Sequence, residues 1–435
     1  MVVTNNVLVT PKIFAKLVLF SLRTRNNVCR NMSTEVTKEF QNKAMKVGET
    51  VQVRRPYRFL VTPGLAWQPQ PLQDTVMTVK VDRPLQIGFQ WDSIEKTLSL
   101  REANELYAEP AAIAMSSTVN AQAAQFCAQN TANYAGTPGT APNDVATFLR
   151  PGDIITEQGL PENEMLNMII NRKMSSTYIS ARSVYYNPQQ EIASEVQKGV
   201  IVDQTLGYTI NRDQTIYTQQ IGTFAGTPVI DATSALQGDG GNNGTQTLAV
   251  SGFTGGSGSN SINLGDKFTI ANVYSVHPQT HQSTGRLQCF TVLGNAVDAS
   301  GLMNLTIYPA ITPASVVVQP NSPQYPNVNA AAVVGAAVLF WAGTSSSPAA
   351  SSGIASVQGL VMHKNAFAFV SVPLASPPSG TGDTTIVSEA KDPETGMWMS
   401  FIRAFDSRDR IWINRFDTLI GLARLYAEMS AVLAA

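Results

Sequence analysis

Charged side chains are scarce in this sequence. Asp, Glu, Lys and Arg make up 14% of its 435 residues, against roughly 25% in average globular proteins. A free monomer of this length normally covers itself with charge, whereas a chain that buries much of its surface against partners can do without it. A β-rich secreted protein coated with Ser, Thr, Asn and Gln would have the same composition, so both interpretations stay open. The net charge of −1 does not indicate a nucleic-acid or acidic-membrane binder.

Cysteines and long apolar runs are scarce as well. The three cysteines, Cys29, Cys127 and Cys289, are too few and too far apart for a disulfide framework or a zinc site. We therefore expect reduced thiols, with Cys127 in the core, which suits a cytoplasm. The longest apolar run, 330–343, is shorter than the roughly 20 residues that span a bilayer. We expect neither a membrane segment nor a signal peptide.

The motifs of common enzymes are missing too. The sequence contains no His-Glu-x-x-His, no Gly-x-Ser-x-Gly and no Gly-Lys pair. His277 and His281 have the spacing of metal ligands on a helix, but Pro278 between them favours a loop. The sequence therefore predicts no catalytic, cofactor or metal site, and we expect no enzymatic activity.

The first 48 residues are predicted to form an N-terminal arm. Five basic residues precede the first acid, Glu35, and a short amphipathic helix is expected over 13–20. A transit peptide, a basic arm on nucleic acid and an arm that packs on a neighbouring subunit would all fit, and we favour the last. The basic residues of the arm are candidates to face a scaffold or DNA. They are Lys12, Lys16, Arg23, Arg25 and Arg30.

Residues 49–92 are predicted to form a long β-hairpin. Polar and apolar residues alternate over 49–55 and again over 75–81. The Pro-, Gly- and Gln-rich tip at 62–74 is too long for a tight turn, which indicates an extended loop. A lone hairpin is marginal in water, so we expect this one to lie on a partner. Near its base, the candidates for intersubunit ion pairs are Arg54, Arg55 and Arg58, with a solvated face as the alternative.

Helices are expected in the middle of the chain. An Ala-rich helix is predicted over 98–135, with Gly136 as its C-terminal stop. A second helix is predicted from Pro161 through Ile170, a short strand over 177–186, and a helix start at 187–190. The apolar face of the first helix is predicted from spacings of four, four and three: Met115, Val119, Ala123 and Phe126.

The segment 226–345 differs from the rest of the chain. No Asp, Glu, Lys or Arg occurs between Asp298 and Lys364, and short strand-like runs alternate with turn residues. This pattern predicts an inserted all-β module, a small barrel or sandwich, within an α+β protein. Its predicted strands are 247–250, 267–274, 287–293, 302–308 and 315–318. Three or four further strands are expected over 384–425, with Trp398 and Trp412 packed across two of them.

The order of these parts and four stretches of sequence resemble a known family. The stretches are Val47–Pro56, Gly265–Pro278, Gly359–Phe367 and Arg415–Asp417 with Gly421. Together they are similar to the HK97-like capsid fold of tailed bacteriophages and, more narrowly, to the coat proteins of the phage P22 family.

The resemblance implies a division of the chain into capsid domains. The parts are the arm 1–48, the extended hairpin loop 49–92, a spine helix and peripheral domain 93–140 with 375–435, an axial domain 141–225 with 346–374, and the inserted domain 226–345. It also implies a major capsid protein that assembles into the pentamers and hexamers of an icosahedral head around double-stranded DNA.

The expected partners follow from the same resemblance. They are further copies of the chain, a scaffolding protein on which a procapsid forms before it expands, a portal protein, the packaged DNA bound non-specifically, and a decoration protein as a further candidate. The expected location is the virion, assembled in the bacterial cytoplasm. The competing interpretation is a β-rich tail or receptor-binding protein, which does not account for the Ala-rich helix between a hairpin and a mixed lobe.

Overall fold

The computed structural model shows a β-rich chain with few helices. It describes residues 27–34, 50–55, 58–59, 61, 65, 76–92, 109–160, 164–182, 204–205, 207–235, 244–314, 325–341, 352–374, 386–392 and 395–435. The chain divides into two compact units. Unit 1 comprises residues 1–51, 79–123 and 368–423, and unit 2 comprises residues 52–78, 124–367 and 424–435.

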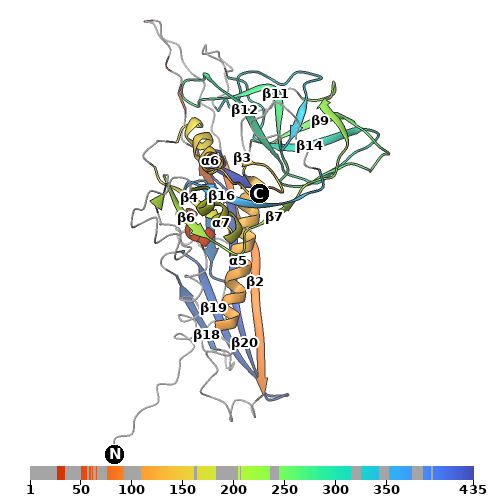
Figure 1. The fold of residues 1–435 in the computed structure, drawn as a ribbon. Coiled ribbons are helices and arrows are strands. Elements are labelled where there is room, and N and C mark those ends of the chain that lie inside the picture. The colour runs from red at the N-terminus through yellow and green to blue at the C-terminus, as the bar shows by residue number, and fades with distance from the viewer. Residues whose placement is uncertain are drawn as a thin grey trace, which may run out of the picture. The chain divides into compact units, whose positions relative to one another are not determined.

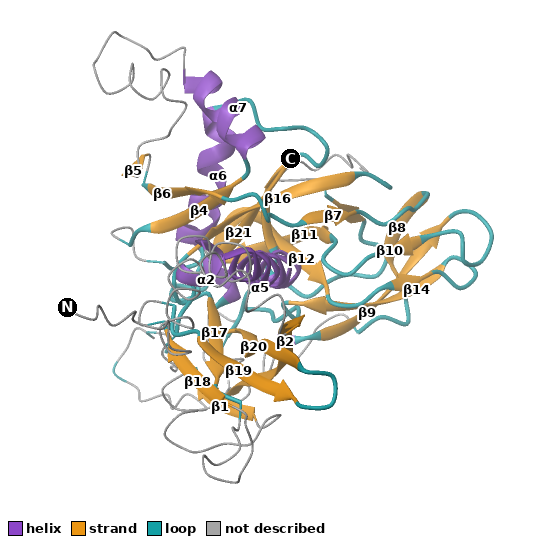
Figure 2. Ribbon diagram, turned by 90° about the horizontal axis from the view of Figure 1, so that it is seen from below, coloured by secondary structure: helices purple, strands orange, loops and turns teal. Residues whose placement is uncertain are grey.

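A six-stranded sheet lies largely in unit 1, and β2, β18, β19 and β20 pair antiparallel within it. Its strand order is β1-β2-β20-β19-β18, and β17 also pairs with β20 (Figure 2). The bounds are β1 Thr50–Arg54, β2 Val76–Asp92, β17 Phe367–Val372, β18 Ile386–Lys391, β19 Trp398–Asp406 and β20 Ile411–Arg424. Both strands of the predicted hairpin and the predicted C-terminal strands are thus confirmed, while most of the hairpin tip lies outside the described residues.

Aromatic pairs pack across this sheet, although not the pair that the sequence indicated. Trp398 and Trp412 do lie on adjacent strands, but the register places Phe405 opposite Trp412, with ring centroids 4.9 Å apart. Trp398 instead lies opposite Lys391 of β18. At Gly421 of β20, an added Cβ would come within 2.5 Å of the Lys80 carbonyl oxygen, so no larger residue fits that register.

The Ala-rich helix α5 spans Glu109–Asn130. Met115, Val119 and Ala123 are buried as predicted, and Phe126 is half-buried. The helix ends five residues earlier than expected, and 133–136 form β3 instead. Gly136 is therefore no helix stop: it has φ +88° at the end of β3, where a Cβ would collide with the Ala434 carbonyl oxygen. The predicted start of the helix, 98–108, lies outside the described residues.

A seven-stranded mixed sheet lies in unit 2, in the order β3-β21-β16-β4-β6-β5, with β7 also paired to β16. Figure 1 labels β3, β4, β6, β7 and β16 of this sheet. The bounds are β3 Asn133–Gly136, β4 Leu166–Ile170, β5 Gln204–Thr205, β6 Tyr208–Arg212, β7 Thr218–Gln220, β16 Ala355–Met362 and β21 Ser430–Ala434. The helix predicted from Pro161 through Ile170 is wrong for 166–170, because these residues form a strand that runs parallel to β6 and antiparallel to β16, while 161–163 lie outside the described residues. A short apolar run buried on both faces has no periodicity that separates strand from helix.

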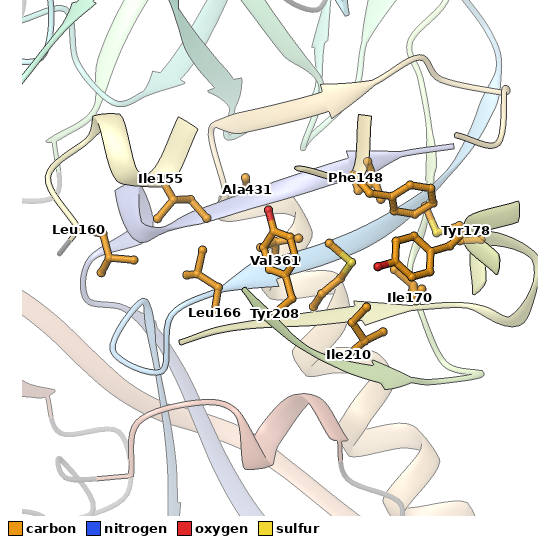
Figure 3. Close-up of a cluster of buried hydrophobic side chains, with 13 residues drawn as sticks. Phe148, Ile155, Leu160, Leu166, Ile170, Tyr178, Tyr208, Ile210, Val361 and Ala431 are labelled. Carbon is orange, nitrogen blue, oxygen red and sulfur yellow. The ribbon is translucent and has the colours of Figure 1, made fainter. Parts of the chain in front are cut away.

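Two helices, α6 Val145–Glu157 and α7 Arg172–Arg182, pack on this sheet. The strand predicted over 177–186 is wrong for 177–182, which are helical, and the predicted helix start at 187–190 lies outside the described residues. Figure 3 shows Phe148, Ile155 and Tyr178 from the helices facing side chains of the strands. Each large apolar side chain buried in this way contributes about 1.5–3 kcal/mol to stability.

Helix α6 contains Pro151, whose missing N–H interrupts the helical hydrogen bonds. The hydroxyl group of Tyr208 in β6 supplies hydrogen-bond partners to two backbone groups of this turn. It donates to the Leu149 carbonyl and accepts from the Gly152 N–H, both at 2.9 Å. Gly152 permits the approach, because a Cβ there would collide with the phenol oxygen. The helix and the sheet are thereby joined by two polar contacts as well as by apolar packing.

We expect Tyr208→Phe to lower the free energy of unfolding by about 2 kcal/mol, because it leaves two partly buried backbone groups of α6 without partners. Urea unfolding of the unassembled chain, followed by circular dichroism, measures the effect. Tyr274→Phe is the matched control, since Tyr274 is only half-buried, and it should stay within about 0.5 kcal/mol of the parent. Equal effects of the two changes would contradict the assignment.

Unit 2 also holds a six-stranded antiparallel sheet in the order β15-β11-β12-β14-β9-β8 and a two-stranded sheet β10-β13. The bounds are β8 Gly226–Ile230, β9 Gln246–Phe253, β10 Ser261–Ile262, β11 Lys267–Val276, β12 Ser283–Val292, β13 Ala296–Val297, β14 Leu302–Tyr308 and β15 Val338–Phe340. Four strands predicted within 226–345 are present as β9, β11, β12 and β14, and the fifth, at 315–318, lies outside the described residues.

Candidate functional site

The base of the hairpin leads directly to three arginines. In β1 the side chains alternate, so that Val51 is buried while Arg54 is exposed. Arg55, the next residue, turns inward, and only 12% of its side chain is exposed. Arg58 is exposed to 27%. The alternation of the strand thus separates Arg54, which faces solvent, from Arg55 and Arg58, which have partners within their own unit.

Glu428 is the carboxylate that holds both inward arginines. Arg55 Nη2 and Arg58 Nη2 both donate to Glu428 Oε1, the second at 3.2 Å. Glu428 lies in the 3-10 helix η4, Ala427–Met429, and its carbonyl accepts a hydrogen bond from Asn133 Nδ2. Burial raises the pKa of Glu428, but the two guanidinium groups outweigh burial and hold this pKa below its usual value.

Tyrosine rings surround these charges. The Arg55 guanidinium carbon lies 5.3 Å from the ring centroids of Tyr325 and Tyr426. Arg424, at the end of β20, lies 4.2 Å from the Tyr308 ring. Such contacts stabilise a partly desolvated cation by about 0.5–2 kcal/mol. We call this set the arginine–tyrosine cluster; its members are Arg55, Arg58, Arg424, Glu428, Tyr308, Tyr325 and Tyr426.

Of the predicted arm residues, the structure describes Arg30. Arg30 is exposed at the end of the short helix α2, Asn27–Arg30, where Asn120 Oδ1 of α5 accepts from the Val28 N–H. The remaining basic residues of the arm, Lys12, Lys16, Arg23 and Arg25, lie outside the described residues. A role of any of these residues between subunits stays a prediction.

A second polar centre in unit 2 joins the end of α5 to the β11–β12 hairpin. Lys267 at the start of β11 is completely buried. Its ammonium group donates to the Ala128 carbonyl at 3.0 Å and to the Thr131 carbonyl, and lies 5.9 Å from the Trp341 ring centroid. A cation at a helix C-terminus is favoured by the helix dipole. Desolvation lowers the pKa of Lys267 to about 7, against the opposing effect of Asp266.

These contacts explain where α5 ends. Thr131 Oγ1 donates to the Cys127 carbonyl. The Lys267 ammonium group donates to the Ala128 carbonyl. Thr291 Oγ1 of β12 donates to the Gln129 carbonyl at 3.1 Å. The last carbonyl groups of a helix lack partners within it, and here strands far along the chain supply the donors. The helix therefore stops at Asn130, and the chain is free to enter β3.

Asp266 fixes the loop next to Lys267. Its carboxylate accepts from the backbone N–H groups of Gly222 and Asn263, both at 2.9 Å, and from Gln219 Nε2 at 3.1 Å. Burial raises the pKa of Asp266 in spite of these hydrogen bonds. The pair Asp266 and Lys267 thus connects three segments of unit 2.

Sequence reasoning missed Glu428, Arg424 and Lys267. For Lys267 a signal was present, since an Asp-Lys pair opens an apolar strand in a region with almost no charge. Glu428 and Arg424 carry no local signal, because their partners are more than 100 residues away.

Other expectations from the sequence concern cysteine, histidine and the membrane. All three cysteines are free and buried, as expected for Cys127. His277 and His281 lie in a turn between β11 and β12, as predicted. Within the described ranges, no three His, Cys, Asp or Glu side chains gather as a metal site would require. None of the described helices combines the length and apolarity needed to cross a bilayer.

Comparison with known structures gives matches to phage proteins at low identity. A chain from Mycobacterium phage Che8 matches at TM-score 0.44 and 11% identity over 94% of this chain and 91% of its own. A chain from the capsid of Ralstonia phage GP4 matches at TM-score 0.42 and 6% identity over 93% and 86%. One from the mature capsid of bacteriophage PhiM1 matches at TM-score 0.38 and 8% identity over 88% and 81%. No curated protein matches the sequence.

Residues 34–432 match the family described as P22 coat protein, gene protein 5. The match includes the sheet of unit 1, the three sheets of unit 2 apart from the last two residues of β21, helix α5 and the arginine–tyrosine cluster. The chain therefore belongs to the P22 coat protein family, whose members are structural proteins of phage capsids.

Proposed function

We propose that this chain is a major capsid protein that assembles into the pentamers and hexamers of an icosahedral phage head. The observation that carries the proposal is the family match over residues 34–432. The low charge content of 14% supports it, because repeated contacts around a shell bury surface that a free monomer would leave in water.

The finer parts of the proposal follow the family resemblance. The fold is the HK97-like capsid fold, with residues 226–345 as its inserted β module and the domain division expected from the sequence. The head forms as a procapsid on a scaffolding protein, takes up double-stranded DNA through a portal protein, and expands. A decoration protein is a further candidate partner, and assembly takes place in the bacterial cytoplasm.

The geometry of the hairpin base supports a role in assembly. A projecting loop can hold a neighbouring subunit only if its base is rigid. Here Arg55 and Arg58 bind Glu428 in a mostly buried ion pair, which fixes the chain where it leaves β1. Arg54 is exposed on the same strand, so its charge is available to a neighbour. We infer that Arg55 and Arg58 set the direction of the loop, while Arg54 is the contact candidate.

Negative-stain microscopy of the chain expressed with and without its scaffolding protein tests this function. We expect closed shells or curved capsid-like sheets, and their yield should fall several-fold when the arm residues Lys12, Lys16, Arg23, Arg25 and Arg30 are all changed to glutamine. Arg150→Gln, at an exposed position of α6, is a single-charge control and should leave the yield unchanged. Monomers alone would contradict the proposal, and trimeric fibres would favour a tail protein.

A further inference from the structure

The arginine–tyrosine cluster contains more positive than negative charge. Arg55, Arg58 and Arg424 contribute three guanidinium groups, and among the described residues Glu428 is the one carboxylate that forms an ion pair with any of them. Two positive charges are therefore left in a region where the side chains are mostly buried. Charges removed from water are normally paired, because the cost of desolvation is otherwise several kcal/mol.

Two buried N–H donors of the cluster also lack an acceptor, in agreement with the excess of positive charge. Arg55 Nε and Arg424 Nη1 are both buried without a hydrogen-bond partner. Buried donors of this kind are rare in native proteins, and a bound ion or an ordered water can supply the missing acceptor. They belong to two different segments of the chain, so one local distortion cannot account for both.

The same groups converge on one phenol. Burial and Glu428 raise the pKa of Tyr308, and Arg424, Arg55 and Arg58 lower it, so all four charged groups act on this hydroxyl group. Tyr325 covers Arg55 and Arg58, with ring centroids 5.3 and 5.5 Å from their guanidinium carbons. Arg58 and Glu428 keep 27% and 20% of their side chains exposed, which leaves a side from which a ligand can approach.

We propose that the arginine–tyrosine cluster is a binding site for a compact oxyanion, bound by the unpaired guanidinium donors of Arg55 and Arg424 with Arg58 at its entrance. Guanidinium groups present planar, fixed donors that match the oxygens of a carboxylate or a phosphate. A cation is excluded by the charge of the site. The tyrosine rings, whose centroids lie 4.2 to 5.5 Å from the guanidinium carbons, stabilise these cations beside the bound oxyanion.

The oxyanion could come from two sources with the same chemistry. In a shell, an acidic side chain of a second copy of this chain would bring a carboxylate to the entrance at Arg58. In the unassembled chain, free phosphate would take its place. The first source rests on the proposed function, whereas binding of a free oxyanion does not, so the two can fail separately.

Thermal unfolding of the unassembled chain in increasing sodium phosphate tests the site itself. Oxyanions also stabilise proteins generally, by an effect that grows steadily with concentration. A bound ion instead adds a saturating gain, which we expect to be about 3 °C in the unfolding midpoint. Arg424→Met should abolish the saturating gain. Arg58→Met should raise about tenfold the phosphate concentration at which half of the saturating gain is reached. Arg150→Met, at an exposed position in the same unit, should leave it intact.

Assembled shells distinguish the two sources. If a carboxylate of a second copy fills the site, wild-type shells lose the saturating phosphate gain that the unassembled chain shows. If free oxyanion fills it, the gain persists in shells. The proposal is overturned if the unassembled chain shows only the steady effect, or if Arg58→Met and Arg424→Met, checked for folding by circular dichroism, both retain the saturating gain.

Discussion

Replacing Glu428 by glutamine is expected to lower the free energy of unfolding by about 4 kcal/mol, because removal of one partner of a buried ion pair leaves its cations uncompensated. Glutamine keeps the size of the side chain and one oxygen that can accept from Arg55 and Arg58. The change therefore isolates the charge. With Arg424 nearby, three guanidinium groups would share the cluster without a carboxylate from the described residues.

Glu157→Gln is the matched control for this prediction. Glu157 also accepts from an arginine, Arg286 Nη2 at 3.0 Å, but its side chain is exposed to 36%. Exposed pairs contribute roughly 0–1 kcal/mol. Urea unfolding of both variants should therefore separate them by about 3 kcal/mol, and similar losses would show that burial does not matter at Glu428.

The Glu428 effect should depend on pH in a defined direction. The pKa of Glu428 is lower in the folded chain than its usual value of 4.5. Its stabilising contribution is therefore complete above about pH 4.5 and is lost as the pH falls through the lowered pKa. The difference between the parent chain and Glu428→Gln should shrink over this acidic range.

Replacing Lys267 by methionine is expected to cost about 3 kcal/mol at pH 7. Methionine fills the buried space, but the carbonyl groups of Ala128 and Thr131 lose their donor, and each unsatisfied group costs about 1–3 kcal/mol. Loss of the buried charge offsets part of this cost. Lys364→Met, at an exposed position of the same unit, is the control and should stay within about 0.5 kcal/mol.

Alkaline pH should increase the difference in the free energy of unfolding between the parent chain and Lys267→Met. The pKa of Lys267 is lowered to about 7 from 10.5. Between these values the unfolded chain binds a proton that the folded chain has released, so the stability of the parent rises with pH by at most about 1.4 kcal/mol per unit. Lys267→Met lacks this rise. Parallel pH profiles of parent and variant would show that Lys267 keeps its proton.

Much of the strand pattern followed from the sequence. The alternation around Val51 and Val79 predicted β1 and β2, and the apolar runs separated by turn residues predicted β9, β11, β12 and β14. These features are local, because side chains on a strand alternate between its two faces and turn residues interrupt it. The buried face of α5 was predictable for the same reason, from spacing that repeats with the helical turn.

The errors concern segments whose conformation depends on distant partners. Leu166–Ile170 is a strand because β6 and β16 enclose it on both sides, although its composition suits either structure. Gly136 was assigned to a helix end, yet the close approach of β21 at Ala434 is what requires glycine there. Neither neighbour can be read from the residues next to these positions.

The sequence by itself determined the family, the strands in which polar and apolar residues alternate, and the buried face of α5, because each of these depends on the order and spacing of residues. Only the tertiary structure decided where α5 ends and which arginines are buried. The donors to the last carbonyl groups of α5 come from Lys267 and Thr291, 139 and 162 residues away from Ala128 and Gln129, and Arg55 meets Glu428 across 373 residues. Hydrogen bonds and ion pairs of that kind form between whichever groups folding brings together, and the local sequence pattern does not predict them.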